Sequence, residues 1–168
     1  SAPERILLGV GVGGEDRHEM EVCGVNPATR GLQTNHCLAA LAELMSGQSS
    51  SYDCEFFSYD AALIKPAPAP KIPILVGGRS SAALRRTARY GDGWLGVWCS
   101  PKRFEQAITE VTQGAASLGR EPEWQHGLQL WVGLGRDVSR ARACLAGEME
   151  QMYRPPFAAF EKYSPSGS

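Results

Sequence analysis

The most informative part of the sequence is Pro73-Ile-Leu-Val-Gly-Gly-Arg-Ser80, which continues as Ser81-Ala-Ala-Leu-Arg-Arg-Thr-Ala-Arg-Tyr90 and Gly91-Asp-Gly-Trp94. Its apolar start predicts a buried strand over Ile72–Val76. Ser80 then caps a helix that runs to Tyr90 and stops at Gly91. A strand that ends in glycines at the mouth of a helix leaves backbone N–H groups that can hold a phosphate. The stretch therefore predicts a cofactor-binding α/β protein.

The charge of the chain is balanced, with 17 basic and 18 acidic residues among 168. Nucleic-acid and membrane partners usually require a concentrated basic face, so we expect neither. The longest apolar runs have the length of strands, not of membrane-spanning helices. Ser1-Ala-Pro-Glu4 shows no basic region followed by an apolar stretch, as a secretion signal would. The length suits a single domain, residues 1–168.

The five cysteines are scattered and form no C-x-x-C pair; they are Cys23, Cys37, Cys54, Cys99 and Cys144. Reduced thiols in a cytoplasmic protein explain this pattern. The three histidines lie far apart in the chain without the spacing of metal ligands, so we expect no metal site.

The first third of the chain is irregular. Residues 5–12 are almost wholly apolar, as in a parallel strand covered on both faces. A long polar, glycine-interrupted loop is expected over 13–29. Apolar residues at helical spacing then predict a helix that includes Leu38–Met45 and ends at Gly47. Residues 48–70 read as an insertion with one short strand at Cys54–Ser58.

Beyond residue 70 strands and helices alternate regularly. Strands are expected at Trp94–Trp98 and Gly127–Leu134, and helices at Pro101–Leu118 and after Asp137, which caps the last one. The expected inner faces of these two helices are Phe104, Ile108, Val111, Ala115 and Leu118, and Val138, Ala141, Leu145, Met149 and Met152. This alternation predicts a parallel sheet built from four βα units with right-handed crossovers.

Two glycine motifs are candidate binding sites. Gly9, Gly11 and Gly14 satisfy G-x-G-x-x-G, but the polar residues after Gly14 give no apolar face for the helix that a dinucleotide site needs, so a Rossmann-type dehydrogenase is disfavoured. Gly77–Ser80 is the stronger site. It reads either as a phosphate cradle, with Arg79 adding charge, or as an ordinary strand–helix turn with a serine cap.

The other candidate residues lie at one or the other end of a predicted strand, and ligands of parallel α/β proteins bind at the carboxyl ends. Asp92 lies at the start of its strand, away from the usual binding edge, and is read as structural. Trp98, Cys99 and Ser100, together with Gly133–Arg136, are expected at the binding edge. No G-x-S-x-G elbow or P-loop lysine is present, and no catalytic residue is assigned.

Motifs spread over nearly the whole chain resemble the bacterial luciferase-like monooxygenase superfamily of flavin- or deazaflavin-dependent TIM barrels. The matching pieces are Leu8-Gly-Val-Gly-Val-Gly-Gly-Glu15, Gly24-Val25, Arg30-Gly31, Phe56-Phe57, Lys65-Pro-Ala-Pro68, Pro73–Ser80 and Gly91-Asp-Gly-Trp94. The resemblance implies that Gly77, Gly78, Arg79 and Ser80 hold a cofactor phosphate and that Gly13 and Gly14 pass near the ring system. The cofactor would be coenzyme F420 or FMN, and the glycine motifs are closer to those of deazaflavin users.

The resemblance also covers only part of a barrel. It implies a half TIM barrel that runs from about the fourth to the seventh βα unit, without the strands that supply the catalytic His in many relatives. Val12 stands where luciferase has Arg, and Asn35-His36 where relatives often have an acidic pair. An uncovered face carrying Ile6, Leu8 and Leu75 would favour a homodimer.

Two functions from different classes follow from these expectations. The first is a flavin- or F420-dependent oxidoreductase or monooxygenase that acts on a small molecule. The second is a catalytically inactive half-barrel that serves as a ligand-binding or self-assembling module.

Overall fold

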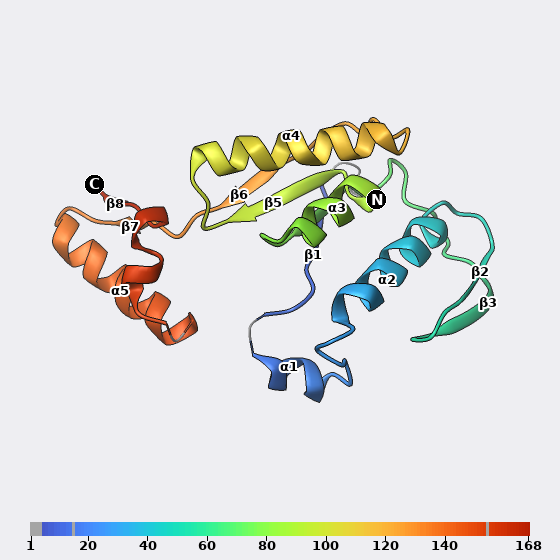
Figure 1. The fold of residues 1–168 in the computed structure, drawn as a ribbon, viewed down its shortest axis with the longest axis horizontal. Helices are drawn as coiled ribbons and strands as arrows, with labels where there is room; N and C mark the ends of the chain where they lie inside the picture. The colour runs from blue at the N-terminus through green and yellow to red at the C-terminus, as the bar shows by residue number, and fades with distance from the viewer. Residues whose placement is uncertain (1–4, 15, 154) are drawn as a thin grey trace.

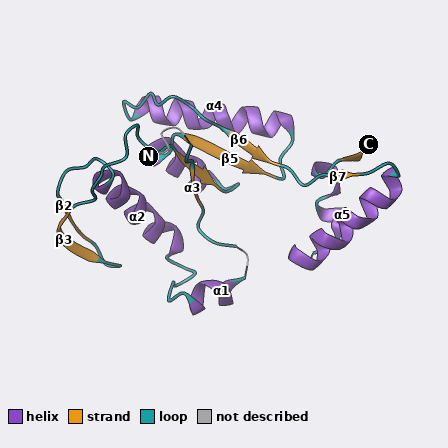
Figure 2. Ribbon diagram, turned by 180° about the vertical axis from the view of Figure 1, so that it is seen from behind, coloured by secondary structure: helices purple, strands orange, loops and turns teal. Residues whose placement is uncertain are grey.

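The computed structural model describes residues 5–14, 16–153 and 155–168, and its centre is a parallel sheet (Figures 1 and 2). Within the described residues this sheet has four strands in the order β1-β4-β5-β6. The strands are β1 (Leu8–Val10), β4 (Ile74–Gly77), β5 (Gly93–Val97) and β6 (Gly127–Gln129). All three pairings are parallel, so the predicted α/β class with a mainly parallel sheet is confirmed.

Three helices surround one face of this sheet: α2 (Arg30–Leu44), α3 (Ser81–Tyr90) and α4 (Pro101–Ser117). Leu38 of α2 packs on Ile74 and Val76 of β4 in one buried cluster. Leu84 of α3 and Val111 of α4 pack on Trp94 in a second cluster. The side chains of Ile74, Val76 and Trp94 thus mark the helix-facing side of the sheet, and their burial provides its main apolar contact.

The opposite face of the sheet is lined by glycines and leucines. Gly9, Leu75 and Gly93 are adjacent in register, and so are Gly77, Leu95 and Gly127. A Cβ added at Gly127 would lie 3.1 Å from Cδ1 of Leu95 and 4.0 Å from Cδ2 of Leu75, so these three residues share this face. Leu75 and Leu95 are only half-buried, whereas Ile74, Val76 and Trp94 on the helix-facing side are almost completely buried.

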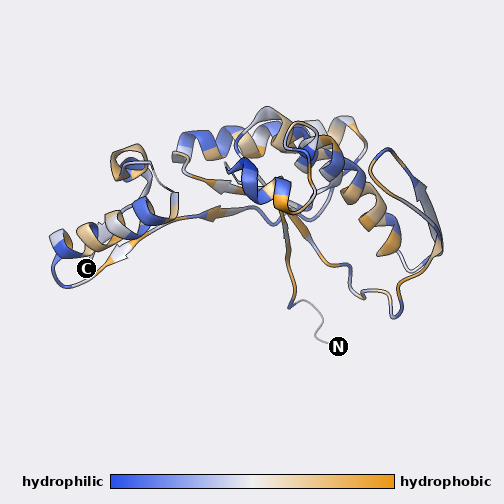
Figure 3. Ribbon diagram, turned by 90° about the horizontal axis from the view of Figure 1, so that it is seen from below, coloured by the Kyte–Doolittle hydropathy of each residue, from blue (hydrophilic) through white to orange (hydrophobic). Residues whose placement is uncertain are grey.

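The expected position of Leu8 on this face is wrong. Leu8 packs with Ile74 and Val76 under the helices. Because side chains alternate along a strand, Leu7 and Gly9 take the other side. A run of apolar residues carries no alternation from which to assign sides. The segment that leads into β1 is apolar (Figure 3), and Ile6 and Leu7 are more than half exposed.

The expected long loop over 13–29 contains a short helix, α1 (Arg17–Val22). Asp16 caps this helix, because its Oδ1 accepts a hydrogen bond of 2.9 Å from the backbone N–H of His18. Met20 is its only buried residue. A helix with one buried side chain shows no apolar stripe in the sequence, which is why periodicity missed it.

The segment 48–70 forms an antiparallel hairpin of β2 (Ser50–Asp53) and β3 (Ser58–Ala62). The single strand expected at Cys54–Ser58 is therefore wrong, because residues 54–57 are the connection. Tyr52 stacks on Phe57 and on Tyr59, with centroids 5.6 and 6.2 Å apart. Tyr52 and Tyr59 are partners across the two strands, and a cross-strand aromatic pair of this kind stabilises a hairpin.

The strand expected at Gly127–Leu134 is split into two pieces. Its first part is β6, but β7 (Gly133–Leu134) leaves the main sheet and pairs with β8 (Ser166–Gly167). These strands belong to a C-terminal unit with α5 (Val138–Tyr153), η1 (Phe157–Ala159) and η2 (Glu161–Tyr163), at the left of Figure 1. Leu145, Met149, Phe157 and Phe160 form its core.

In α4 and α5, the residues expected on the inner face are buried near the middle of each helix but exposed at its ends. Val111 and Ala115 are buried in α4, while Leu118 at its C-cap is 55% exposed. In α5 the buried residues are Ala141, Leu145 and Met149, whereas Val138 and Met152 are exposed. Both helices extend beyond the surface on which they pack. Among the described residues, no helix is both long and apolar enough to cross a membrane.

Candidate cofactor site

The turn from Gly77 to Ser80 connects β4 to α3 at the carboxyl end of the sheet. Gly78 has φ +124°, a backbone conformation that residues with a Cβ rarely adopt. A Cβ there would also lie 2.8 Å from Cβ of Ala83. The turn therefore requires glycine for its geometry, and the absence of a side chain keeps the backbone open to a ligand.

Ser80 caps α3, as the sequence predicts. Its backbone is extended, and its Oγ accepts a hydrogen bond from Ala83 N over 3.2 Å. The amides of Ser81 and Ala82 in the first turn have no acceptor within the helix, because the helix supplies none there. These N–H groups and the positive end of the helix dipole favour an anion at this end of α3.

Two tryptophans from β5 and its end contact the same turn. Nε1 of Trp94 donates a hydrogen bond of 2.8 Å to the carbonyl oxygen of Gly78. The exposed Arg79 places its guanidinium carbon 5.4 Å from the ring centroid of Trp98. The position of Trp98 at this edge was expected from the sequence, but neither contact follows from sequence spacing.

Gly13 and Gly14 belong to the loop that follows β1. Because β1 and β4 are parallel neighbours, this loop starts at the same edge of the sheet as the turn after β4. Gly13 has φ +90°, and a Cβ there would lie 3.3 Å from Cγ of Met20. The carbonyl of Gly14 accepts a hydrogen bond from Nη1 of Arg30 over 2.8 Å. Arg30 of α2 thereby anchors this loop. Glu15, the last residue of the quoted glycine motif, lies outside the described residues.

Of the other residues expected at the binding edge, Cys99 and Ser100 follow β5 there, whereas Gly133–Arg136 lie elsewhere. Ser100 follows β5 at the binding edge and caps α4, where its Oγ accepts from Arg103 N over 3.2 Å. Burial raises the pKa of the Cys99 thiol, which makes it a poor nucleophile. Gly133–Arg136 were expected at this edge, and that is wrong, because Gly133 and Leu134 pair with β8.

Asp92 has the structural role that the sequence suggested. Its buried carboxylate accepts hydrogen bonds from Ile74 N over 3.0 Å and from Nζ of Lys71 over 2.7 Å. It thereby ties the beginnings of β4 and β5 together at the edge opposite the turn. Beside it lies a cavity of about 1250 Å³.

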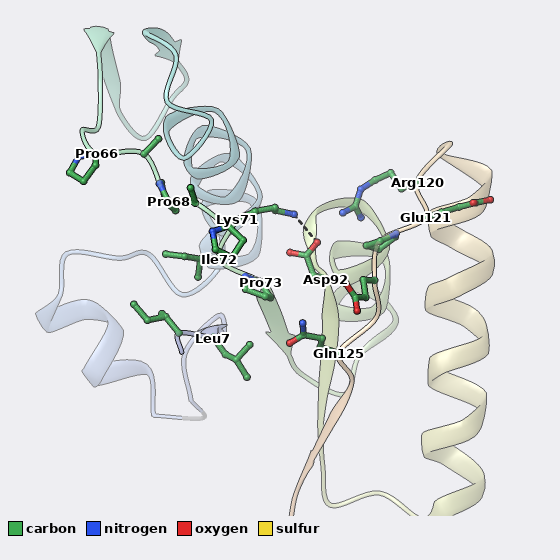
Figure 4. A pocket seen from close by; sticks show the side chains of 16 residues that line it. Leu7, Pro66, Pro68, Lys71, Ile72, Pro73, Asp92, Arg120, Glu121 and Gln125 are labelled. Atoms are coloured by element: carbon green, nitrogen blue, oxygen red, sulfur yellow. Dashed lines mark hydrogen bonds and ion pairs between the residues drawn. The ribbon is translucent and has the colours of Figure 1, made fainter. Parts of the chain in front are cut away.

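This cavity is lined by segments that precede the strands, as Figure 4 shows with Leu7, Pro68, Asp92 and Gln125. Its charged groups are largely used by the fold: Lys71 pairs with Asp92, and Arg120 donates to the carbonyls of Ala88 and Gly91. Parallel α/β proteins bind ligands at the carboxyl ends of their strands. Despite its size, the cavity is therefore not the candidate cofactor site.

His126 has a role that the sequence analysis did not assign. Its Nδ1 accepts a hydrogen bond from Trp94 N over 3.0 Å, which places the proton of the neutral ring on Nε2. Burial lowers the pKa of this imidazole and keeps it neutral. Within residues 5–14, 16–153 and 155–168, no three His, Cys, Asp or Glu side chains gather as metal ligands would.

Comparison with known proteins gives a consistent assignment. The family model for the luciferase-like monooxygenases matches residues 2–165. An uncharacterized protein of Mycobacterium tuberculosis is 35% identical over 114 residues, which are 67% of this chain and 39% of that protein. The F420-dependent hydroxymycolic acid dehydrogenase of the same species is 26% identical over 84% of this chain and 39% of its own length.

Solved structures share the fold. An F420-dependent secondary alcohol dehydrogenase, in complex with an F420–acetone adduct, superposes with a TM-score of 0.77 at 22% identity, over 92% of this chain and 48% of that one. The oxygenating constituent of 3,6-diketocamphane monooxygenase from Pseudomonas putida, in complex with FMN, gives 0.62 at 13% identity, over 88% and 46%. The chain thus spans about half the length of these structures, and less of the curated relatives.

Proposed function

The chain belongs to the luciferase-like monooxygenase family, and from this we propose that it binds F420 or FMN as part of an oxidoreductase acting on a small molecule. Gly77, Gly78, Arg79 and Ser80 would hold the phosphate, and Gly13 and Gly14 would pass near the ring system. The observation that carries the proposal is the backbone of Gly78, whose φ of +124° and lack of a side chain leave the turn open beside the N-terminus of α3.

The residues present fit a phosphate group. The turn offers the first amides of α3, the hydroxyl of Ser80 and the guanidinium of Arg79, all of which donate hydrogen bonds. The carbonyl of Gly78, which would repel an anion, is instead occupied by the indole N–H of Trp94. A bound flavin or deazaflavin would supply the hydride or oxygen chemistry, and this chain would bind, orient and shield it.

The experiment is a fluorescence titration of the purified protein with FMN and, separately, with F420. We expect a dissociation constant below the millimolar range for at least one of them. Arg79→Ala should weaken it by about three- to tenfold, because a charge-assisted hydrogen bond is lost. Arg85→Ala, which removes another exposed arginine of α3, is the matched control and should leave binding unchanged. Binding weaker than millimolar for both cofactors would overturn the proposal.

We further propose that residues 1–168 form one domain, a half-barrel of four βα units with 48–70 as an insertion, and that two copies associate. Among the described residues β1 and β6 are the outer strands of the sheet, and these edges, together with the half-buried Leu75 and Leu95, support association. Eight parallel strands close a barrel and remove both edges. A two-fold pair of such sheets would bring β1 of one copy near β6 of the other.

The second candidate is a half-barrel that binds a ligand or assembles without catalysis. The half-buried Leu75 and Leu95 favour it, because accessible apolar surface is typical of interaction sites. If the protein self-associates but binds neither cofactor, this second function replaces the first.

A further inference from the structure

Trp98 stands at the carboxyl end of β5 with an unusual backbone. Its φ is +47°, in the left-handed region that bulky residues rarely occupy. Such backbone conformations persist where the surrounding structure holds them, and they are concentrated at functional sites. The residue directly follows β5, the strand next to β4, and its ring is beside the turn that runs from Gly77 to Ser80, where it contacts Arg79.

The Trp98 ring is held by aromatic contacts from the C-terminal unit. Tyr153 meets it edge-on, with centroids 4.8 Å apart and an interplanar angle of 83°. Phe160 contacts it at 4.6 Å. Nε1 of Trp98 is buried and has no hydrogen-bond partner among the described residues. The ring is therefore positioned by packing and not by a hydrogen bond.

Arg79 lies over this ring. Its guanidinium carbon is 5.4 Å from the centroid, within the range of a cation–π interaction. Arg79 is otherwise exposed, and an exposed arginine samples many rotamers, whose loss opposes binding. A cation–π contact with a ring that its neighbours hold in place removes part of this freedom before a ligand arrives.

The two tryptophans thus act on different parts of one turn. Trp94 binds the backbone at Gly78, and Trp98 holds the side chain of Arg79. We propose that Trp98 is a positioning residue, which keeps the Arg79 guanidinium at the rim of the sheet for the phosphate or phosphodiester of a bound ligand. This inference rests on the proposed function of the turn.

The test compares ligands with and without phosphate: FMN against riboflavin, and F420 against the ribityl deazaflavin that lacks the phosphodiester. Trp98→Leu should weaken binding of the phosphorylated ligand by about three- to tenfold, while binding of its unphosphorylated partner stays the same. Trp98→Phe keeps a ring and should restore part of the affinity. In an Arg79→Ala background, Trp98→Leu should have no further effect.

Trp131→Leu is the matched control, because Trp131 contacts Tyr153 in the same cluster, at 5.8 Å. It should leave phosphate-dependent affinity unchanged. Near-ultraviolet circular dichroism checks folding, and Trp98→Phe carries the test if the leucine variant does not fold. The proposed role of Trp98 would be overturned by an equal loss of affinity for both members of a ligand pair, or by additive losses of affinity in the double variant. The proposed function of the turn would then still stand. Failure of the wild-type protein to bind either cofactor would overturn this role together with the proposed function.

Discussion

At the scale of single residues, Gly78 is the position where the backbone of the turn requires glycine and where the proposed phosphate site also needs an open backbone. Gly78→Ala places a Cβ at φ +124° and 2.8 Å from Cβ of Ala83. We expect the free energy of unfolding to fall by about 1–3 kcal/mol, because of this strain. Urea denaturation followed by circular dichroism measures the change, and cofactor titration should show lost binding.

Gly147→Ala is the control for Gly78. Gly147 is exposed in α5, and a Cβ there would meet nothing within 4 Å. Its replacement should stabilise the protein by up to about 1 kcal/mol, because alanine favours helix. Equal effects of the two substitutions would contradict the strain argument.

Asp92 is a second residue whose role is local and testable. In the wild-type protein the backbone N–H of Ile74 donates a hydrogen bond of 3.0 Å to the Asp92 carboxylate, and Asp92→Ala removes this acceptor. A buried amide without a partner lowers the free energy of unfolding by about 1–3 kcal/mol. The exposed Asp53→Ala should change it by less than about 0.5 kcal/mol in the same denaturation experiment. Loss of cofactor affinity with unchanged stability would instead assign Asp92 to the site.

At the scale of elements, His126 joins β6 to β5 in a pH-dependent way. Its Nδ1 must be unprotonated to accept from Trp94 N, and burial lowers its pKa in the folded state. The unfolded chain therefore binds the proton more readily, so this contribution is complete above the usual pKa near 6.5 and is lost as the pH falls.

We accordingly expect the free energy of unfolding to decrease between pH 7 and pH 5. His126→Gln should flatten the profile in this window, whereas His18→Gln, at an exposed position, should not. Denaturant titrations at each pH measure it. A wild-type stability that rises on acidification would contradict the assigned protonation state.

At the scale of the whole molecule, the sheet face that carries Leu75 and Leu95 is the contact surface of the proposed dimer. Leu75→Glu puts a charge among Leu95 and Gly127, and it should convert the proposed dimer into a monomer, because a buried unpaired carboxylate opposes contact. Leu118→Glu, at an exposed position at the end of α4, should remain a dimer. Light scattering at micromolar concentration distinguishes the two. A monomeric wild-type protein would overturn the proposal.

The glycine-rich turn and the parallel α/β class were predictable from the sequence because their signals are local. Ser80 precedes its helix as a cap, and Gly91 ends that helix. Asp137 likewise caps α5, accepting from Arg140 N over 3.1 Å. Caps and strand lengths depend on neighbours along the chain, so the strand–turn–helix order needed no tertiary information.

The parallel α/β class, the Gly77–Ser80 turn and the family motifs could all be read from the amino-acid sequence without any tertiary contact. The tertiary structure alone decided which face of β1 is covered, where the strand after residue 127 ends, and which side chains meet at the rim. Leu8 packs with Ile74, and Gly133 pairs with Ser166, through contacts between segments far apart in the chain. Arg79 and Trp98 meet for the same reason: two parallel strands bring their carboxyl ends to one edge, and no local pattern encodes that encounter.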